Sequence, residues 1–159
     1  MSGAQDQTRT AVVFRVEGQR HAIPLEAVAR VFRMVAITPA PQAHRFLLGA
    51  VDIAGQVAPV VNTRKLLGVT DRPIELSDQL IHVRTAAGAA VLWVDAGTDL
   101  VEFPASALPR ESQAAGGWWA SAAVLRDAEG LVHYHDPNQL LGFLKEPGVT
   151  GNPSAGGPA

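Results

Sequence analysis

The chain has 159 residues, of which 47% are hydrophobic and 18% charged, so it has enough apolar material for a packed core and does not read as disordered. Its formal net charge is −2 and its basic residues are scattered singly or in pairs, so the basic stripe of a nucleic-acid-binding protein is missing. Because there is no cysteine, disulfides, thiolate metal sites and thiol catalysis are excluded.

The two ends of the chain differ in composition from its middle. Met1–Thr10 is polar and lacks the apolar stretch of a signal peptide, and no apolar run approaches the roughly 20 residues that cross a bilayer. Glu146–Ala159 is rich in Gly and Pro and cannot bury enough surface to offset its ordering entropy. We therefore expect a cytoplasmic protein without membrane insertion, folded over residues 11–145, with flexible tails at residues 1–10 and 146–159.

Short apolar segments bounded by turn residues fill the folded part. They predict four β-hairpins: Ala11–Val16 with Arg20–Pro24, Val51–Ile53 with Val57–Val61, Leu80–Thr85 with Ala89–Val94, and Ala123–Arg126 with Leu131–His135. Regularly spaced short strands of this kind indicate an all-β sandwich or barrel. We expect the apolar residues of Val12–Phe14 and Val57–Val61 to be buried, because an exposed Val-rich edge invites aggregation.

Helices are predicted to be few and short. The candidates are Leu25–Val31, Thr63–Leu67 and Pro137–Leu144. Thr63 and Asp136 stand where a cap accepts backbone N–H bonds, and Pro137 suits a first helical position.

Two stretches of the chain repeat the same order of features. Ala50–Gly68 and Ala123–Gly142 each read as strand, glycine turn, strand, Asn or Asp, and a short helix ending in Leu-Leu-Gly. The hairpins Val12–Pro24 and Leu80–Val94 also correspond. We therefore predict two similar small barrels, roughly residues 11–75 and 76–145, with an exchange of terminal segments left open. Each half is near the lower size limit for autonomous stability, so we expect a shared interface core.

No catalytic site is predicted. No serine stands in a strand-to-helix elbow, and the P-loop, G-x-G-x-x-G and H-E-x-x-H motifs are absent. His133 and His135 flank Tyr134 in a predicted strand, so both imidazoles point to one face. A zinc or copper site there needs a third ligand from His21, His44, His82 or Asp136. No ligand pattern of known spacing supports it, so we predict no metal and no cofactor.

Acidic and aromatic residues leave two smaller questions. Asp95, Asp99 and Glu102 follow a predicted strand and could bind Mg²⁺ or Ca²⁺, but the glycine-centred calcium loop is missing and solvated turn acids explain them better. Trp93 is predicted to pack in the core, since its run of Val and Leu reads as buried on both faces. For Trp118 and Trp119, a ligand platform and a partner contact both stay open.

The most specific pattern runs from Pro39 to Gly68 and reads PAPQAHRFLLGAVDIAGQVAPVVNTRKLLG. It resembles the signature of CheW-type chemotaxis adaptors: a proline-bounded loop, a Gly-Val-x-Asn-Leu-Arg-Gly-like turn, Val-x-Pro-Val-x-Asp-Leu and a short helix. Matching positions are Pro41, Gly49, Val51, Ile53, Gly55, Val57, Pro59, Val60 and Gly68. Val12-Val13-Phe14, Val94-Asp95, His135-Asp136 and Leu140-Leu141 extend the resemblance over nearly all of the folded part.

The resemblance implies both a fold and a function. CheW-like domains consist of two five-stranded SH3-like barrels around a shared hydrophobic interface, without catalytic residues. The regulatory domain of the histidine kinase CheA has the same fold and pairs with the adaptor barrel to barrel, and receptor tips dock in the groove between the barrels. The resemblance therefore implies a non-enzymatic scaffold that couples chemoreceptor tips to a CheA-like histidine kinase.

The resemblance also implies which residues contact partners: Val28, Arg30, Asp52, Ala54, Gly55 and Gln56. Three positions depart from the family pattern. Ala54 stands where an arginine is usual, Arg30 where many members have an acid, and Val91 where glycine is common. Two alternatives therefore stay open: a regulatory CheW-like domain that binds a kinase but no standard receptor, and a small-molecule-binding or metal-binding β-barrel.

Overall fold

The computed structural model describes residues 7–40, 44–108 and 123–146. The strands are β1 (Thr8–Val16), β2 (Gln19–Pro24), β3 (Val28–Arg33), β4 (Thr38–Pro39), β5 (Leu47–Ile53), β6 (Gln56–Asn62), β7 (Gln79–Thr85), β8 (Gly88–Pro104), β9 (Ala123–Asp127) and β10 (Gly130–Tyr134). The helices are α1 (Thr63–Leu66) and α2 (Pro137–Leu140), with short 3-10 turns η1 (Leu25–Ala27), η2 (Ala105–Ala107) and η3 (Gly142–Lys145).

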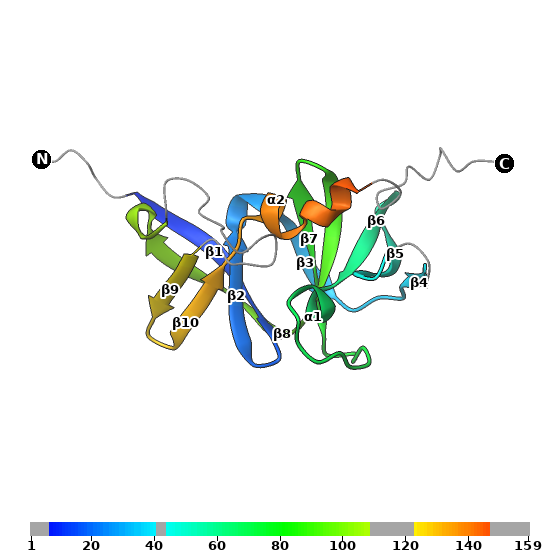
Figure 1. The fold of residues 1–159 in the computed structure, drawn as a ribbon, viewed down its shortest axis with the longest axis horizontal. Helices are drawn as coiled ribbons and strands as arrows, with labels where there is room; N and C mark the ends of the chain where they lie inside the picture. The colour runs from blue at the N-terminus through cyan, green and yellow to red at the C-terminus, as the bar shows by residue number, and fades with distance from the viewer. Residues whose placement is uncertain (1–6, 41–43, 109–122, 147–159) are drawn as a thin grey trace, which may run out of the picture.

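The strands form two barrels that share β8. In the first barrel, β1, β2, β9 and β10 are joined by the later part of β8, which pairs with β1. In the second barrel, β3 to β7 are joined by the earlier part of β8, which pairs with β6 and β7. Figure 1 shows the two barrels side by side, with α2 above the place where they meet.

Both barrels use the same pairing pattern. In the second barrel β6 runs parallel to β8 and leads into α1, and in the first β10 runs parallel to β2 and leads into α2. The hairpin β5–β6 thus corresponds to β9–β10, and β7–β8 corresponds to β1–β2. Strands from both sequence halves, 11–75 and 76–145, enter each barrel. In the first barrel β1 pairs with β8 and β2 with β10, and in the second β3 pairs with β7 and β6 with β8.

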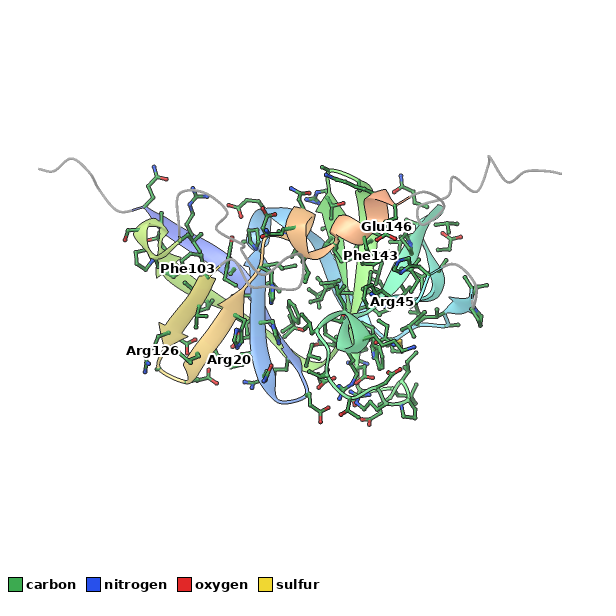
Figure 2. All side chains as sticks on the ribbon, in the orientation of Figure 1. Arg20, Arg45, Phe103, Arg126, Phe143 and Glu146 are labelled. Atoms are coloured by element: carbon green, nitrogen blue, oxygen red, sulfur yellow. The ribbon has the colours of Figure 1, made fainter. Side chains whose placement is uncertain are left out.

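Three apolar clusters account for the packing, one inside each barrel and one between them. The inner clusters contain Val13, Phe103 and Val132 in the first barrel and Val60, Leu80 and Trp93 in the second. The cluster between the barrels joins side chains of β1, β2, β7 and β8, and the segment from α2 to η3 adds Leu140, Leu141, Phe143 and Leu144. Figure 2 labels Phe103 at the first barrel and Phe143, Arg45 and Glu146 at the second. The predicted all-β fold of two barrels around a shared apolar interface is confirmed.

Five details of the sequence prediction are wrong. The helix expected over Leu25–Val31 is only the single turn η1, because β-branched Val28 and Val31 lie in β3 and pair with β7. The tail expected at residues 1–10 is too long, since Thr8–Thr10 pair with β8; residues 1–6 and 147–159 lie outside the described ranges. β8 does not end at Val94: Gly97, with φ +101°, lets the strand bend from one barrel into the other.

The fourth concerns Val57, which is 62% exposed, whereas Val60 and Val61 are buried as expected. Val57 lies opposite exposed Asp52 next to the turn, beyond the end of the barrel core. The predicted cap at Thr63 also falls one residue late, because Asn62 accepts the backbone N–H of Lys65. Asp136 caps α2 and Pro137 begins it, as expected.

Candidate partner-binding groove

A groove of about 450 Å³ opens at the edge of the second barrel. It is lined by Arg30, Phe32, Val35, Ala36, Thr38, Val51, Asp52, Ile53 and Ala54. The groove exists because, among the described strands, β3 pairs only with β7 while β5 pairs with β4 and β6, so no described strand bridges β3 and β5. One wall is therefore β3 and the segment after it, and the other is β5 with its turn.

A bulge in β3 decides which side chains reach the groove. Val28 lies opposite Val83, and Arg30 lies opposite His82, the neighbouring residue on β7. Since successive residues of β7 point to opposite faces, Val28 and Arg30 also face opposite sides, although they are two residues apart. Val28 packs against the cluster between the barrels, and Arg30 faces the groove.

The other wall ends in a tight two-residue turn. Ala54 has φ +52° and Gly55 has φ +90°, the combination expected of a type I′ hairpin turn between Ile53 and Gln56. The carboxylate of Asp52 accepts the backbone N–H of Gly55 at 2.8 Å, so it fixes the turn as well as lining the groove. On the same wall, Gly49 allows β4 to lie against β5, because a Cβ there would lie 2.0 Å from the carbonyl oxygen of Thr38.

The two walls carry opposite charges. The guanidinium carbon of Arg30 lies 5.8 Å from the ring centroid of Phe32, and among the described residues no carboxylate lies within ion-pair distance of Arg30. Burial lowers the pKa of neighbouring His82, and the positive charges of Arg84 and Arg30 lower it further. The β3 side of the groove is thus cationic, and Asp52 on the facing wall is anionic.

The structure brings together three of the six residues expected to bind partners. Arg30, Asp52 and Ala54 line the groove, Gly55 and Gln56 are exposed beside it, and Val28 lies on the other face of β3. All lining residues belong to the second barrel, so the groove does not lie between the barrels. Sequence reasoning missed Phe32, Val35, Ala36, Thr38, Val51 and Ile53 as lining residues. Phe32 could have been found from Arg30, because residues two apart in a strand point to the same face, once this segment is recognised as a strand.

Three of the five histidines, His21, His133 and His135, lie close together. His21 Nδ1 and His135 Nε2 lie 2.9 Å apart in a buried hydrogen bond, and the ring of His133 lies 5.3 Å from that of His21. Burial, with the neighbouring imidazoles, lowers the pKa of His21 to about 3 and that of His135 to about 4. The described ranges contain no group of three or more His, Cys, Asp or Glu side chains arranged to hold a metal ion.

Asp95, the first of the three acids after Val94, belongs to a structural network. Asp95 accepts hydrogen bonds from Arg64 at 3.1 Å, Arg72 at 2.7 Å and the backbone N–H of Glu17 at 2.9 Å. Asp99 and Glu102 lie on β8 itself and not in the turn expected for them. The buried Trp93 donates its indole N–H to Asp78 at 2.8 Å, which confirms its place in the core. Trp118 and Trp119 lie outside the described residues.

Comparison with known protein families identifies the family of this chain. The family model of the CheW-like domain matches residues 10–144. The chain belongs to the CheW-like domain family. None of the helices in the described ranges is long and apolar enough to cross a membrane.

Individual relatives agree with this assignment. The chain is 32% identical to the chemotaxis protein CheW of Thermotoga maritima over 36% of this chain and 38% of that one. It is 27% identical to the chemotaxis protein CheW of Rhizobium meliloti over 58% of this chain and 60% of that one, so each match spans less than two thirds of the relative. The crystal structure of the scaffolding protein TtCheW from Thermoanaerobacter tengcongensis superimposes with a TM-score of 0.71 at 19% identity, covering 90% of this chain and 96% of that one, and shows the same fold.

Proposed function

We propose that this chain is a non-enzymatic cytoplasmic adaptor that couples a chemoreceptor tip to the regulatory domain of a CheA-like histidine kinase. The observation that carries the proposal is the match of the CheW-like domain over residues 10–144. The groove supports it, because Arg30, Asp52 and Ala54, which the family resemblance singles out as partner contacts, lie on one exposed surface. In this mechanism the protein acts by assembly, holding receptor and kinase together through separate surfaces.

The direct test is reconstitution from purified components. The tagged chain is incubated with a kinase regulatory domain, with a chemoreceptor tip fragment, and with both, and the complexes are separated by size-exclusion chromatography. We expect a ternary complex, and autophosphorylation of the full kinase should respond to receptor only when the adaptor is present. Failure to bind either component would contradict the proposal.

The charges of the groove favour a second candidate, a CheW-like domain that binds the kinase but no conventional receptor. Arg30 and Ala54 both depart from the residues usual in the family, and both line the groove. Because exposed charges add little to stability but select partners, the double variant Arg30→Glu with Ala54→Arg should melt within about 2 °C of the parent and bind a conventional receptor tip more tightly. Equal affinities of parent and variant at low and physiological salt would show that these positions do not decide receptor choice.

A further inference from the structure

The groove combines an apolar floor with two charges that do not neutralise each other. Phe32, Val51 and Ile53 supply apolar surface between the walls. Arg30 and Asp52 line opposite walls, and no ion pair joins them. A groove of this kind favours an occupant whose own charges are arranged in the opposite order, since complementary charges select partners and like charges repel them.

The β3 side of the groove carries more positive charge than the facing wall carries negative charge. Arg30 lies directly opposite His82, and Arg84 lies two residues further along β7 on the same face. Arg30 and Arg84 have no carboxylate within ion-pair distance among the described residues. On the facing wall, Asp52 is a single negative charge, and its carboxylate already accepts the turn N–H of Gly55.

We propose that the groove binds a protein segment that places an apolar side chain on Phe32, Val51 and Ile53 and a carboxylate against Arg30. The inference rests on the proposed adaptor function and names the chemistry of its partner: an acidic residue faces β3. A partner that presents lysine or arginine at this position is repelled. The specificity therefore resides in the sign of the charge at residue 30.

The charge preference can be tested without a receptor. Two helical peptides of equal length carry leucines and one glutamate on the same face, and the second peptide has lysine in place of the glutamate. Each is titrated into the ¹⁵N-labelled full chain, and backbone amide shifts report the binding site. We expect the glutamate peptide to shift the amides of Arg30, Phe32, Ile53 and Ala54 and to bind about five-fold more tightly than the lysine peptide, with the difference shrinking at high salt.

Three variants test which charged residue causes the preference for the glutamate peptide. Arg30→Gln should abolish the preference for glutamate, whereas Arg33→Gln, which removes an exposed charge from the other face of β3, should leave it unchanged. Asp52→Asn keeps an oxygen that can accept the Gly55 N–H but removes the negative charge, so it should strengthen binding of the glutamate peptide.

Several results would overturn the inference. These are equal affinities for the two peptides, absence of binding by both, or shifts confined to other surfaces. Self-association that shifts the same amides without peptide would also overturn it, because the occupant would then be a second copy of the chain. If the glutamate preference holds but no receptor tip binds, the proposed function fails and the groove chemistry stands. If receptor tips bind and Arg30→Gln changes nothing, only the inference fails.

Discussion

Replacing Gly49 with alanine tests the close approach that builds one wall of the groove. Gly49 lies in β5 and pairs with Pro39 of β4. A Cβ at this position would lie 2.0 Å from the carbonyl oxygen of Thr38, 2.8 Å from its carbonyl carbon and 3.0 Å from the Cα of Pro39. All three atoms belong to the backbone, so no side-chain rotation relieves the overlap. Either β5 shifts within its sheet or β4 moves away.

The second response is the cheaper one, because β4 contains only two residues and, within the part of the chain that the structure describes, pairs only with β5. Overpacking in a folded interior costs about 1–3 kcal/mol, and releasing the short pairing of β4 costs a similar amount. We therefore expect Gly49→Ala to lower the free energy of unfolding by about 1–3 kcal/mol. Because Thr38 lines the groove, the variant should also alter binding there while the rest of the fold persists.

Urea unfolding followed by far-UV circular dichroism measures the loss, and amide exchange at β4 and β5 reports whether β4 has separated. The matched control is Gly142→Ala, since an added Cβ there meets no atom within 4 Å and needs no left-handed backbone conformation. It should unfold within about 0.5 kcal/mol of the parent. A Gly49→Ala protein as stable as this control, with unchanged exchange at β4, would refute the reasoning.

Three further substitutions or conditions have defined outcomes. Asp78→Ala removes the carboxylate that accepts hydrogen bonds from Arg72 (2.8 and 2.9 Å), the backbone N–H of Glu75 (2.8 Å) and the indole N–H of Trp93 (2.8 Å). Urea unfolding should therefore show that the free energy of unfolding falls by about 3–5 kcal/mol. Asp71→Ala, at an exposed site, is the control and should lower it by less than about 1 kcal/mol. Ala54→Gly should raise the melting temperature by a few degrees, since Ala54 has φ +52°, whereas loss of stability would contradict this. The buried His21 and His135 have pKa values of about 3 and 4, below the ordinary 6.5, so the unfolded chain binds more protons than the folded chain below pH 6.5. The free energy of unfolding should be at its full value above pH 6.5 and fall as the pH drops towards 4, by about 2 kcal/mol per imidazole at pH 5. An unchanged urea midpoint between pH 7 and 5 would contradict this.

The hairpins could be predicted from the sequence because their signals are local. Val-rich runs that flank a Gly-containing turn specify both strands and the loop between them, as at Glu17-Gly18 and Ala54-Gly55. Long-range pairing has no such local signal. The continuation of β8 past Gly97 depends on β1 lying beside it, and the exposure of Val57 depends on where the barrel core ends. Both are decided by tertiary contacts rather than by propensity.

The groove could be predicted only in part, and the bulge in β3 explains why. A regular strand would place Val28 and Arg30 on one face, so a pattern of residues alone groups them together. The extra residue at the bulge sends Val28 to the cluster between the barrels and Arg30 to the groove. The resemblance to a family identified the segment, but the direction of each side chain follows from strand register.

Two groups of charged residues in this chain differ in burial and in ion pairing, a difference that the amino-acid composition does not reveal. Arg64, Arg72, Asp78 and Asp95 form a partly buried network in which each charge has at least one partner of opposite sign, so each removal takes a partner from a partly desolvated group and costs stability. Arg30 and Asp52 are exposed and have no ion-pair partner among the described residues, so removing either charge costs little in folding as long as residue 52 keeps an oxygen that accepts the Gly55 N–H. The first group is constrained by the fold, whereas the second can change sign without unfolding the protein. Partner choice in a two-barrel adaptor can therefore diverge at positions such as residue 30 while the barrels, their hairpins and the shared core stay the same.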